Sequence, residues 1–374
     1  MTKAPLVYFC MDCSFSSDGK HYKKCPNCGG VISYRRADNK YHIEKGEYDV
    51  ERYWDFLPLQ DPTKLIRKGN KRTPLTESQE FKSKYPATKV MLKDETKTVT
   101  GSSKDRMAVV ALSQLNEFGE KSIVVSSTGN VASASAWLLR NHPEFQLHCF
   151  IADEFVPRHR FMDAPNITVH RVNSDYDAAI KEGIQFSSEN NVYHDGGYFS
   201  VAKRAGLGMA FIEAWEQSNL TFDYYFQASS SGMGVLGVYE VAKKMKDSGM
   251  IDRIPALMPV QQSSCDPMVK AFEAGEEKIL PEFIVDKPRG IAKAILTGDP
   301  TVCYPSLYKV VKETNGSFIS VTEEEIRSAE KHLNKVENIK ATADGAVALA
   351  GFIKYAETHA DELKGKNVLV NITG

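Results

Sequence analysis

The stretch Thr100-Gly101-Ser102-Ser103-Lys104-Asp105-Arg106 places a lysine after a turn of small residues and at the start of a helical pattern. The apolar periodicity of residues 105–116 predicts that helix, so we expect Lys104 in its first turn. The positive end of a helix dipole disfavours the charged form of a lysine, which makes its amine a better nucleophile. This stretch therefore predicts a reactive lysine, although a lysine taken alone would be an ordinary solvated side chain.

Two further loops of small and hydroxyl residues stand between a predicted strand and a predicted helix. The first is Ser126-Ser127-Thr128-Gly129-Asn130, and the second is Ser229-Ser230-Ser231-Gly232-Met233-Gly234. Ligands of α/β folds bind at such junctions, because the helix N-terminus presents free N–H groups and a positive dipole end. Either loop could be a plain turn, but together with Lys104 they predict a carboxylate site at the first loop and a phosphate site at the second.

Short apolar runs alternate with helical patterns along most of the chain. Strands are expected at residues 89–93, 122–126, 147–152, 224–228 and 366–372, among others. Alternation at this spacing predicts an α/β fold with parallel sheets covered on both faces. The length of 374 residues is enough for two domains or two lobes.

Four cysteines near the N-terminus form a C-x2-C-x11-C-x2-C pattern. They are Cys10, Cys13, Cys25 and Cys28. Two such pairs suit tetrahedral thiolate coordination of a structural Zn²⁺, although the spacer is shorter than usual. Two disulfides or free thiols are the alternatives, and disulfides are rare in a cytosolic chain. We therefore predict a zinc ribbon over residues 1–36, as a small structural appendage.

The bulk composition is that of a soluble enzyme. The net charge of −1 supplies no basic field for nucleic acid or an anionic membrane, so we expect neither as a partner. The chain has no apolar run of about 18 residues and no apolar signal core near its start. A cytoplasmic location is the resulting expectation.

The motifs around Lys104 resemble those of fold type II pyridoxal phosphate enzymes, the tryptophan-synthase-β-like class. Residues 100–106 resemble the "TGSFKDR" segment of that family, with Ser103 in place of Phe, and residues 126–130 resemble its "SSGN" loop. The resemblance extends from about residue 70 to the end. It implies two parallel-sheet α/β lobes behind the ribbon: a large cofactor-binding domain of residues 37–100 and 216–374, and a small substrate-side domain of residues 101–215. It also implies a homodimer.

The same resemblance implies roles for individual residues around a pyridoxal 5'-phosphate cofactor. Lys104 would hold the cofactor as a Schiff base and then remove the α-proton of the substrate. Asn130 would bind the ring hydroxyl, residues 229–234 the phosphate, and Thr373 the ring nitrogen. A neutral hydroxyl at that nitrogen favours expulsion of a leaving group.

Further roles implied by the resemblance concern the substrate, a small amino acid. The loop 126–130 would bind its carboxylate. Lys203 and Arg204 are candidates for binding a leaving phosphate or an anionic nucleophile; the alternative is a solvated charge pair at the start of a helix.

Within the class, the ribbon and residues 265–275 resemble the threonine synthase branch. Residues 197–209 and 223–237 are similar to cysteate synthase, an offshoot of that branch. Threonine synthases usually carry R-x-x-G-x-K-T, whereas this chain has Gly208 and Met209 in place of the last lysine and threonine. The departure argues against O-phosphohomoserine as the substrate.

These features predict an enzyme of amino-acid biosynthesis, a lyase or replacement transferase. The leading interpretation is β-replacement on an O-phosphoserine-like substrate through an aminoacrylate, as in cysteate synthase, where sulfite gives cysteate. The first alternative is threonine synthase, which Thr373 and the ribbon favour. A dehydratase that releases ammonia is a second. A catalytically silent protein whose ribbon is a binding module is a third, and the intact Lys104 and Asn130 argue against it.

Overall fold

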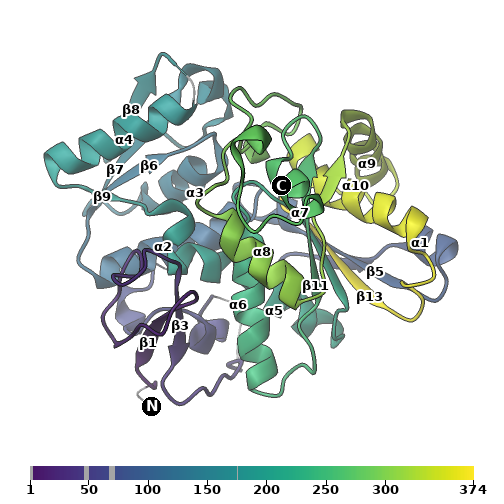
Figure 1. The fold of residues 1–374 in the computed structure, drawn as a ribbon. Coiled ribbons are helices and arrows are strands. Elements are labelled where there is room, and N and C mark those ends of the chain that lie inside the picture. Colours follow the sequence, from purple (N-terminus) through teal and green to yellow (C-terminus); the bar gives the residue numbers. More distant parts are fainter. Residues whose placement is uncertain (1–2, 46–49, 67–71, 175) are drawn as a thin grey trace. The chain divides into compact units, whose positions relative to one another are not determined.

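The structure is a computed structural model that describes residues 3–45, 50–66, 72–174 and 176–374 (Figure 1). Its contacts divide the chain into two compact units. Unit 1 comprises Met1–Asp38, His42–Lys71 and Lys104–Gly206, and unit 2 comprises Asn39–Tyr41, Arg72–Ser103 and Leu207–Gly374. The chain therefore passes between units directly before Lys104. The predicted partition into a ribbon, a large domain and a small domain has different bounds from this division and stays a prediction.

Unit 1 is built on a parallel four-stranded sheet of order β8-β7-β6-β9. The strands are β6 (Ser122–Ser126), β7 (Gln146–Ala152), β8 (Ile167–Val172) and β9 (Tyr193–His194). The helices of the unit are α2 (Lys104–Glu117), α3 (Asn130–Leu139), α4 (Tyr176–Asn190) and the 3₁₀ helices η1 (Val50–Phe56), η2 (Pro62–Lys64), η4 (Asp153–Arg158) and η5 (Gly197–Phe199). Helix α4 packs on β6 and β7, while α2 packs on α3. The apolar run Ile123-Val124-Val125 is buried because helices cover the sheet.

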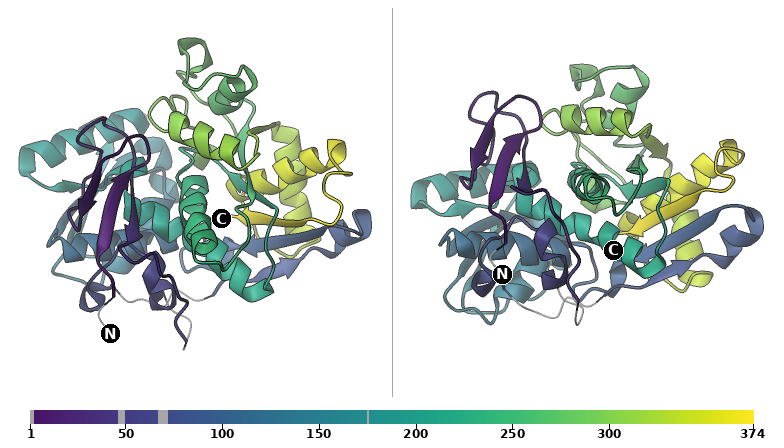
Figure 2. Two further views of the ribbon diagram at one scale, coloured as in Figure 1. Left: turned by 60° about the horizontal axis from the view of Figure 1, so that its bottom comes forward. Right: turned by 90° about the horizontal axis from the view of Figure 1, so that it is seen from below.

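The N-terminal residues of unit 1 form a separate small antiparallel sheet of order β2-β1-β3, drawn in purple in Figure 2. Its strands are β1 (Leu6–Cys10), β2 (Ser16–Asp18) and β3 (Ile32–Arg36). The guanidinium of Arg36 is buried and donates to the backbone carbonyls of Trp54, Leu57 and Leu59 at 3.1, 3.2 and 2.9 Å. These bonds satisfy a buried charge with several acceptors and attach the sheet to the residues that follow it.

Unit 2 is built on a six-stranded sheet of order β12-β11-β10-β13-β5-β4. All neighbours are parallel except the edge strand β4, which is antiparallel to β5. The strands are β4 (Leu75–Glu77), β5 (Lys89–Asp94), β10 (Tyr224–Ala228), β11 (Ala256–Gln262), β12 (Ile319–Val321) and β13 (Asn367–Ile372). The central strands β10 and β13 are almost wholly buried and mostly apolar, as expected for a parallel sheet covered on both faces.

The helices of unit 2 follow the strands in the order expected for crossover connections. They are α1 (Gln79–Lys84), α6 (Met233–Asp247), α7 (Pro267–Glu273), α8 (Tyr304–Glu313), α9 (Glu323–Lys335), α10 (Ala343–Thr358) and the 3₁₀ helices η3 (Glu95–Lys97), η6 (Pro281–Phe283) and η7 (Lys293–Ile295). Helix α5 (Val201–Ser218) begins in unit 1 and ends in unit 2. Helix α10 packs on β10, β11, β12 and β13, where Phe352 contacts Phe226 edge to face.

Two parallel-sheet lobes and a separate N-terminal cysteine-bearing sheet confirm the predicted α/β fold class. Among the described residues, no helix combines the length and the apolar character that crossing a bilayer requires.

Candidate cofactor and substrate site

Lys104 is the first residue of α2 and is half-buried. Burial lowers the pKa of its ammonium to about 8, and the positive charge of Lys203 adds to the effect. A lysine with this pKa is partly neutral near pH 8, whereas an ordinary lysine is almost wholly protonated there. The structure therefore supports the predicted reactivity of Lys104 by desolvation and a neighbouring cation.

The residues before Lys104 are held by the C-terminal end of β13. The backbone N–H of Ser103 donates to the carbonyl of Thr373 at 2.9 Å. A Cβ on Gly374 would lie 2.1 Å from the carbonyl oxygen of Gly101, so the two backbones approach as closely as only glycine allows. Thr373 thus lies next to the turn that precedes Lys104.

The loop of residues 126–130 joins β6 to α3. The hydroxyl of Ser127 accepts from the N–H groups of Gly129 and Ala132 at 3.0 and 3.3 Å, and so caps the helix. Among the described residues, the N–H groups of Thr128, Asn130 and Val131 have no hydrogen-bond acceptor. They leave the positive end of α3 open to an anion, in agreement with the predicted carboxylate site.

Arg158 lies beside this loop, which the sequence did not indicate. A Cβ on Gly129 would lie 3.1 Å from the Cβ of Arg158 and 3.6 Å from its Nε, and Gly129 itself has a φ of +140°. The next residue, His159, donates from Nδ1 to the carbonyl of Phe155 at 2.8 Å, and burial lowers the pKa of its ring. A cation therefore lies near the N-terminus of α3.

The loop of residues 229–234 joins β10 to α6 and is shaped for an anion. Among the described residues, nothing hydrogen-bonds to the buried hydroxyl of Ser229, and the N–H groups of residues 230–234 have no acceptor. Gly232 has a φ of +73°, which turns the backbone at the start of the helix. The hydroxyls of Ser230 and Thr297 lie 2.6 Å apart, so Thr297 is a second residue of this site that the motifs did not reveal.

A buried polar network supports the loop from below. The amide of Asn371 donates to the hydroxyl of Tyr225 at 2.9 Å, and that hydroxyl donates in turn to Gln227. A Cβ on Gly234 would lie 2.0 Å from Nε2 of Gln227. The absence of a side chain at position 234 therefore leaves room for Gln227, which belongs to this network.

Lys203 lies in the first turn of α5, is 5% exposed, and forms an ion pair with Asp195. Burial alone would raise the pKa of Asp195, but the positive charge of Lys203 lowers it below its ordinary range. Both residues line a cavity together with Tyr193, Ser200 and residues of α2, β6 and α3. Lys203 is therefore a buried cation near Lys104, and not the solvated surface lysine of the alternative interpretation.

Arg204 has different surroundings from its neighbour. Its guanidinium is fully buried and donates to the carbonyl of Tyr198 at 2.9 Å and to that of Ile32 in the ribbon sheet. The structure therefore separates the two basic residues that the sequence grouped together.

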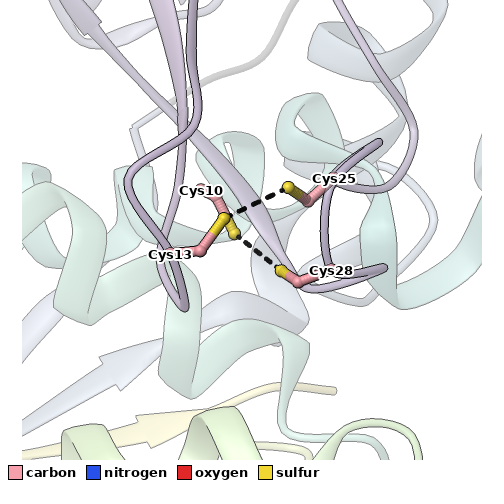
Figure 3. A group of neighbouring side chains, drawn as sticks. All are labelled: Cys10, Cys13, Cys25 and Cys28. Atoms are coloured by element: carbon pink, nitrogen blue, oxygen red, sulfur yellow. Dashed lines mark hydrogen bonds between the residues drawn. The ribbon is translucent and has the colours of Figure 1, made fainter.

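The four N-terminal cysteines form one cluster, shown in Figure 3. Their sulfur atoms lie within 4.8 Å of one another, and none forms a disulfide. The Sγ atoms of Cys10 and Cys28 are 3.5 Å apart, as are those of Cys13 and Cys25. Four thiolates about 2.3 Å from one tetrahedral ion would be separated by about 3.8 Å, so the cluster suits a metal.

Residues 66–374 match the protein family described as pyridoxal-phosphate dependent enzyme, and this chain belongs to that family. The recognition of a pyridoxal phosphate enzyme from the residues around Lys104 is thereby confirmed.

Curated relatives are similar over almost the whole chain. A cysteate synthase of Methanocella paludicola is 26% identical over 98% of this chain and 88% of its own length. A threonine synthase of Methanocaldococcus jannaschii is also 26% identical, over 94% of this chain and 88% of its own length. The similarity to these two kinds of synthase agrees with the branch to which the motifs pointed.

Solved structures share the fold. The processed form of threonine deaminase isoform 2 from Solanum lycopersicum has a TM-score of 0.68 at 15% identity and covers 95% of both chains. Maize serine racemase has a TM-score of 0.66 at 19% identity, over 81% of this chain and 88% of its own. At these identities the likeness concerns the fold.

The residues present fit the family's cofactor. Its phosphate needs several donors in one place, and the loop of residues 229–234 offers unpaired N–H groups and the unsatisfied hydroxyl of Ser229. Its aldehyde needs an amine that is partly unprotonated near physiological pH, and the lowered pKa of Lys104 gives it a larger neutral fraction there than an ordinary lysine has.

Proposed function

We propose that this chain catalyses β-replacement on a phosphorylated hydroxyamino acid of the O-phosphoserine type, as a cysteate-synthase-like enzyme. The observation that carries the proposal is the buried ammonium of Lys203, held by Asp195 within electrostatic range of Lys104. A substrate that loses phosphate, or a nucleophile such as sulfite, brings negative charge that this cation would stabilise. The similarity to cysteate synthases along nearly the full chain supports the same substrate class.

Pyridoxal phosphate, when bound, supplies an electron sink for the bond that breaks at the substrate's α-carbon. Lys104 would hold the cofactor covalently through Nζ. Once released from it, Nζ would take the α-proton, because an amine with a pKa of about 8 is both available as a base and able to return the proton.

The other residues bind and orient. The N–H groups of residues 230–234 and the hydroxyl of Ser229 would bind the cofactor phosphate, with the pair Ser230 and Thr297 beside them. Asn130 would bind the ring hydroxyl. The hydroxyl of Thr373 would hydrogen-bond to the ring nitrogen and leave it largely unprotonated, which favours loss of a β-substituent.

The substrate carboxylate would bind at the open N-terminus of α3, where the N–H groups of Thr128, Asn130 and Val131 are unpaired among the described residues. Lys203 would bind the phosphate or the incoming anion. The guanidinium of Arg204 already donates to two carbonyls, so we leave it out of the substrate site.

Phosphate release tests this assignment. Purified enzyme with its cofactor is incubated with O-phosphoserine or O-phosphohomoserine, with and without sulfite, and both phosphate and amino-acid products are measured. With O-phosphoserine and sulfite together we expect phosphate and an acidic amino acid in equal amounts. Phosphate released from O-phosphohomoserine but not from O-phosphoserine would instead support the threonine synthase alternative.

Threonine synthase is the second candidate, because Thr373 stands where that branch has a threonine and a curated threonine synthase is equally identical to this chain. The glycine at position 208 and the methionine at 209 argue against it. A keto acid formed without added nucleophile would indicate the dehydratase alternative.

We also propose that Cys10, Cys13, Cys25 and Cys28 bind one structural Zn²⁺ as thiolates. Metal analysis should find one zinc per chain, and Cys28→Ser should lose it while Cys303→Ser, a change at a buried cysteine outside the cluster, should keep it. Retention of zinc by Cys28→Ser would place the metal elsewhere. A homodimer and a cytoplasmic location stay predictions.

A further inference from the structure

The ribbon contacts the segment that carries Asp195, the partner of Lys203 in the proposed substrate site. Cys25 is preceded by two lysines, Lys23 and Lys24. The ammonium of Lys23 lies 3.3 Å from the carbonyl of His194 and 3.8 Å from the centre of the Tyr193 ring. The ammonium of Lys24 lies 4.4 Å from the ring centre of Phe199. The two lysines therefore contact the chain on both sides of Asp195.

A third contact runs from α5 back to the ribbon. The guanidinium of Arg204 donates to the carbonyl of Ile32, which follows the second cysteine pair by a few residues. Arg204 is fully buried and also donates to Tyr198, so the ribbon carbonyl satisfies part of a charge that has no access to water. Loss of this acceptor would remove one of the hydrogen bonds of a buried guanidinium, which is more costly than loss of a surface contact.

The contacted segment is short and ends at the substrate site. It runs from Tyr193 through η5 to Arg204 and contains both members of the ion pair, Asp195 and Lys203. Two positive-φ glycines, Gly196 and Gly197, lie where the segment passes from β9 to η5. Its position therefore depends on what packs against it.

On the other side, α5 is packed tightly on α2. A Cβ on Gly206 would lie 2.5 Å from the carbonyl oxygen of Arg106 and 2.8 Å from the Cα of Met107. Arg106 follows Lys104 by two residues. The first turn of α5 is thus held between the start of α2 and the ribbon.

We propose that the metal-bound ribbon is a positioning element of the substrate site, acting through Lys23, Lys24 and Ile32 to hold the Asp195–Lys203 pair in place for an anionic substrate. The proposal rests on the function assigned above for its substrate class, but the positioning itself is a property of the folded chain. In this proposal Lys23, Lys24 and Arg204 are positioning residues, and Lys203 binds the anion.

The metal is expected to matter because it fixes the second cysteine pair. Gly29 has a φ of +74°, and its N–H donates to the carbonyl of Cys25 at 2.8 Å, which forms the tight turn between Cys25 and Cys28. The N–H of Cys25 donates to the carbonyl of Gly30 at 3.0 Å. This turn directly follows Lys23 and Lys24 and directly precedes Val31 and Ile32. Removal of the ion would free the turn from which all three contacts extend.

Hydrogen exchange of the full-length enzyme with its cofactor tests the proposal without turnover. Peptides that cover residues 193–204 are compared between zinc-loaded protein and protein stripped by a chelator, with the α4 peptide as an internal reference. We expect amide exchange in residues 193–204 to rise about tenfold or more on metal loss, and that in α4 to stay within about twofold. Unchanged exchange in residues 193–204 would overturn the proposal.

Steady-state kinetics of lysine variants are a second test, because a merely structural role of these lysines would not change the KM. Lys23→Ala combined with Lys24→Ala should raise the KM for the phosphorylated substrate by about three- to tenfold with little change in kcat or cofactor affinity. Arginine at both positions should restore the KM. Lys20→Ala is the matched control, because Lys20 is an exposed ribbon lysine whose ring contact, Tyr22, lies within the ribbon.

The positioning role of the ribbon and the substrate assignment can be contradicted independently. If exchange rises in residues 193–204 but O-phosphoserine is not turned over, the positioning role stands and the substrate assignment falls. If turnover occurs but neither metal loss nor the lysine variants alter exchange or KM, the ribbon is an appendage and the inference is wrong.

Discussion

The backbone N–H of Ser103 donates a hydrogen bond of 2.9 Å to the carbonyl oxygen of Thr373. Because Lys104 follows Ser103, this bond ties the residue after β13 to the residue directly before Lys104. The bond uses only the backbone of Thr373, so its hydroxyl is left for another partner. The position of the residue and the chemistry of its side chain can therefore be tested separately.

Thr373→Ala should keep the fold and lose part of the catalytic rate. The Ser103 bond survives the change, so we expect the free energy of unfolding to stay within about 0.5 kcal/mol. Loss of a hydrogen bond to the cofactor ring should lower kcat by about tenfold or more and shift the visible absorbance of the bound cofactor. Thr373→Ser keeps the hydroxyl and should retain most of both. Equal kinetics in all three proteins would remove Thr373 from the site.

Lys104 should make the stability of the cofactor-free protein depend on pH. Its pKa is lowered from 10.5 to about 8, so between pH 8 and 10.5 the unfolded chain binds a proton that the folded chain does not. Stability should therefore rise with pH across this window, by up to about 1.4 kcal/mol per pH unit from this group. Lys104→Met removes the group.

The difference in unfolding free energy between wild type and Lys104→Met, measured by chemical denaturation from pH 7 to 10, isolates this contribution. The unfolding free energy of wild type relative to that of the variant should increase as the pH rises. A constant difference would mean that the folded-state pKa of Lys104 is ordinary, which would contradict its activation by burial.

The sequence predicted the parts of the site that lie in one continuous stretch. The turn before Lys104 and the two loops at strand ends are local patterns, and the structure places each of them at a helix N-terminus. Thr297 could not be found this way, because it reaches Ser230 from a position 67 residues later in the chain. Asp195 likewise carries no motif that marks it as the partner of Lys203.

Lys203 and Arg204 show a second limit of sequence analysis. Adjacent residues of a helix point about 100° apart, so a basic dipeptide does not make one cationic site. Lys203 faces Asp195, whereas Arg204 faces the carbonyls of Tyr198 and Ile32. The two residues are therefore neighbours in the sequence but have different partners in the structure, and one partner of Arg204 lies in the ribbon sheet.

Gly232 in the phosphate loop can be compared with a glycine of almost the same backbone conformation elsewhere. Gly232 and Gly249 have φ values of +73° and +75°, but a Cβ on Gly232 would lie 2.0 Å from Cδ1 of Leu307, whereas one on Gly249 would meet nothing within 4 Å. Gly249→Ala should cost about 1–2 kcal/mol of stability from backbone strain alone. Gly232→Ala should cost about 1–3 kcal/mol more, because it also overpacks.

The two glycine variants should differ even more in cofactor binding. Gly232→Ala displaces the loop whose N–H groups would bind the phosphate, so its affinity for pyridoxal phosphate should fall by about tenfold or more, while Gly249→Ala should bind normally. Titration of the cofactor-free proteins, followed by absorbance, measures this. Normal affinity in Gly232→Ala would show that the phosphate binds elsewhere.

The ion pair of Lys203 and Asp195 allows stability to be separated from substrate binding. Lys203→Met leaves the Asp195 carboxylate without its cation in a largely buried position, which should cost about 3–5 kcal/mol. The double variant Lys203→Met with Asp195→Asn removes both charges and should recover most of that stability. The double variant should not recover affinity for a phosphorylated substrate, because the ammonium is still missing.

We therefore expect a folded, cofactor-binding double variant whose KM for O-phosphoserine is raised by about tenfold or more. Thermal unfolding and steady-state kinetics on the same samples decide the matter: a stable double variant with a normal KM would make Lys203 a purely structural residue.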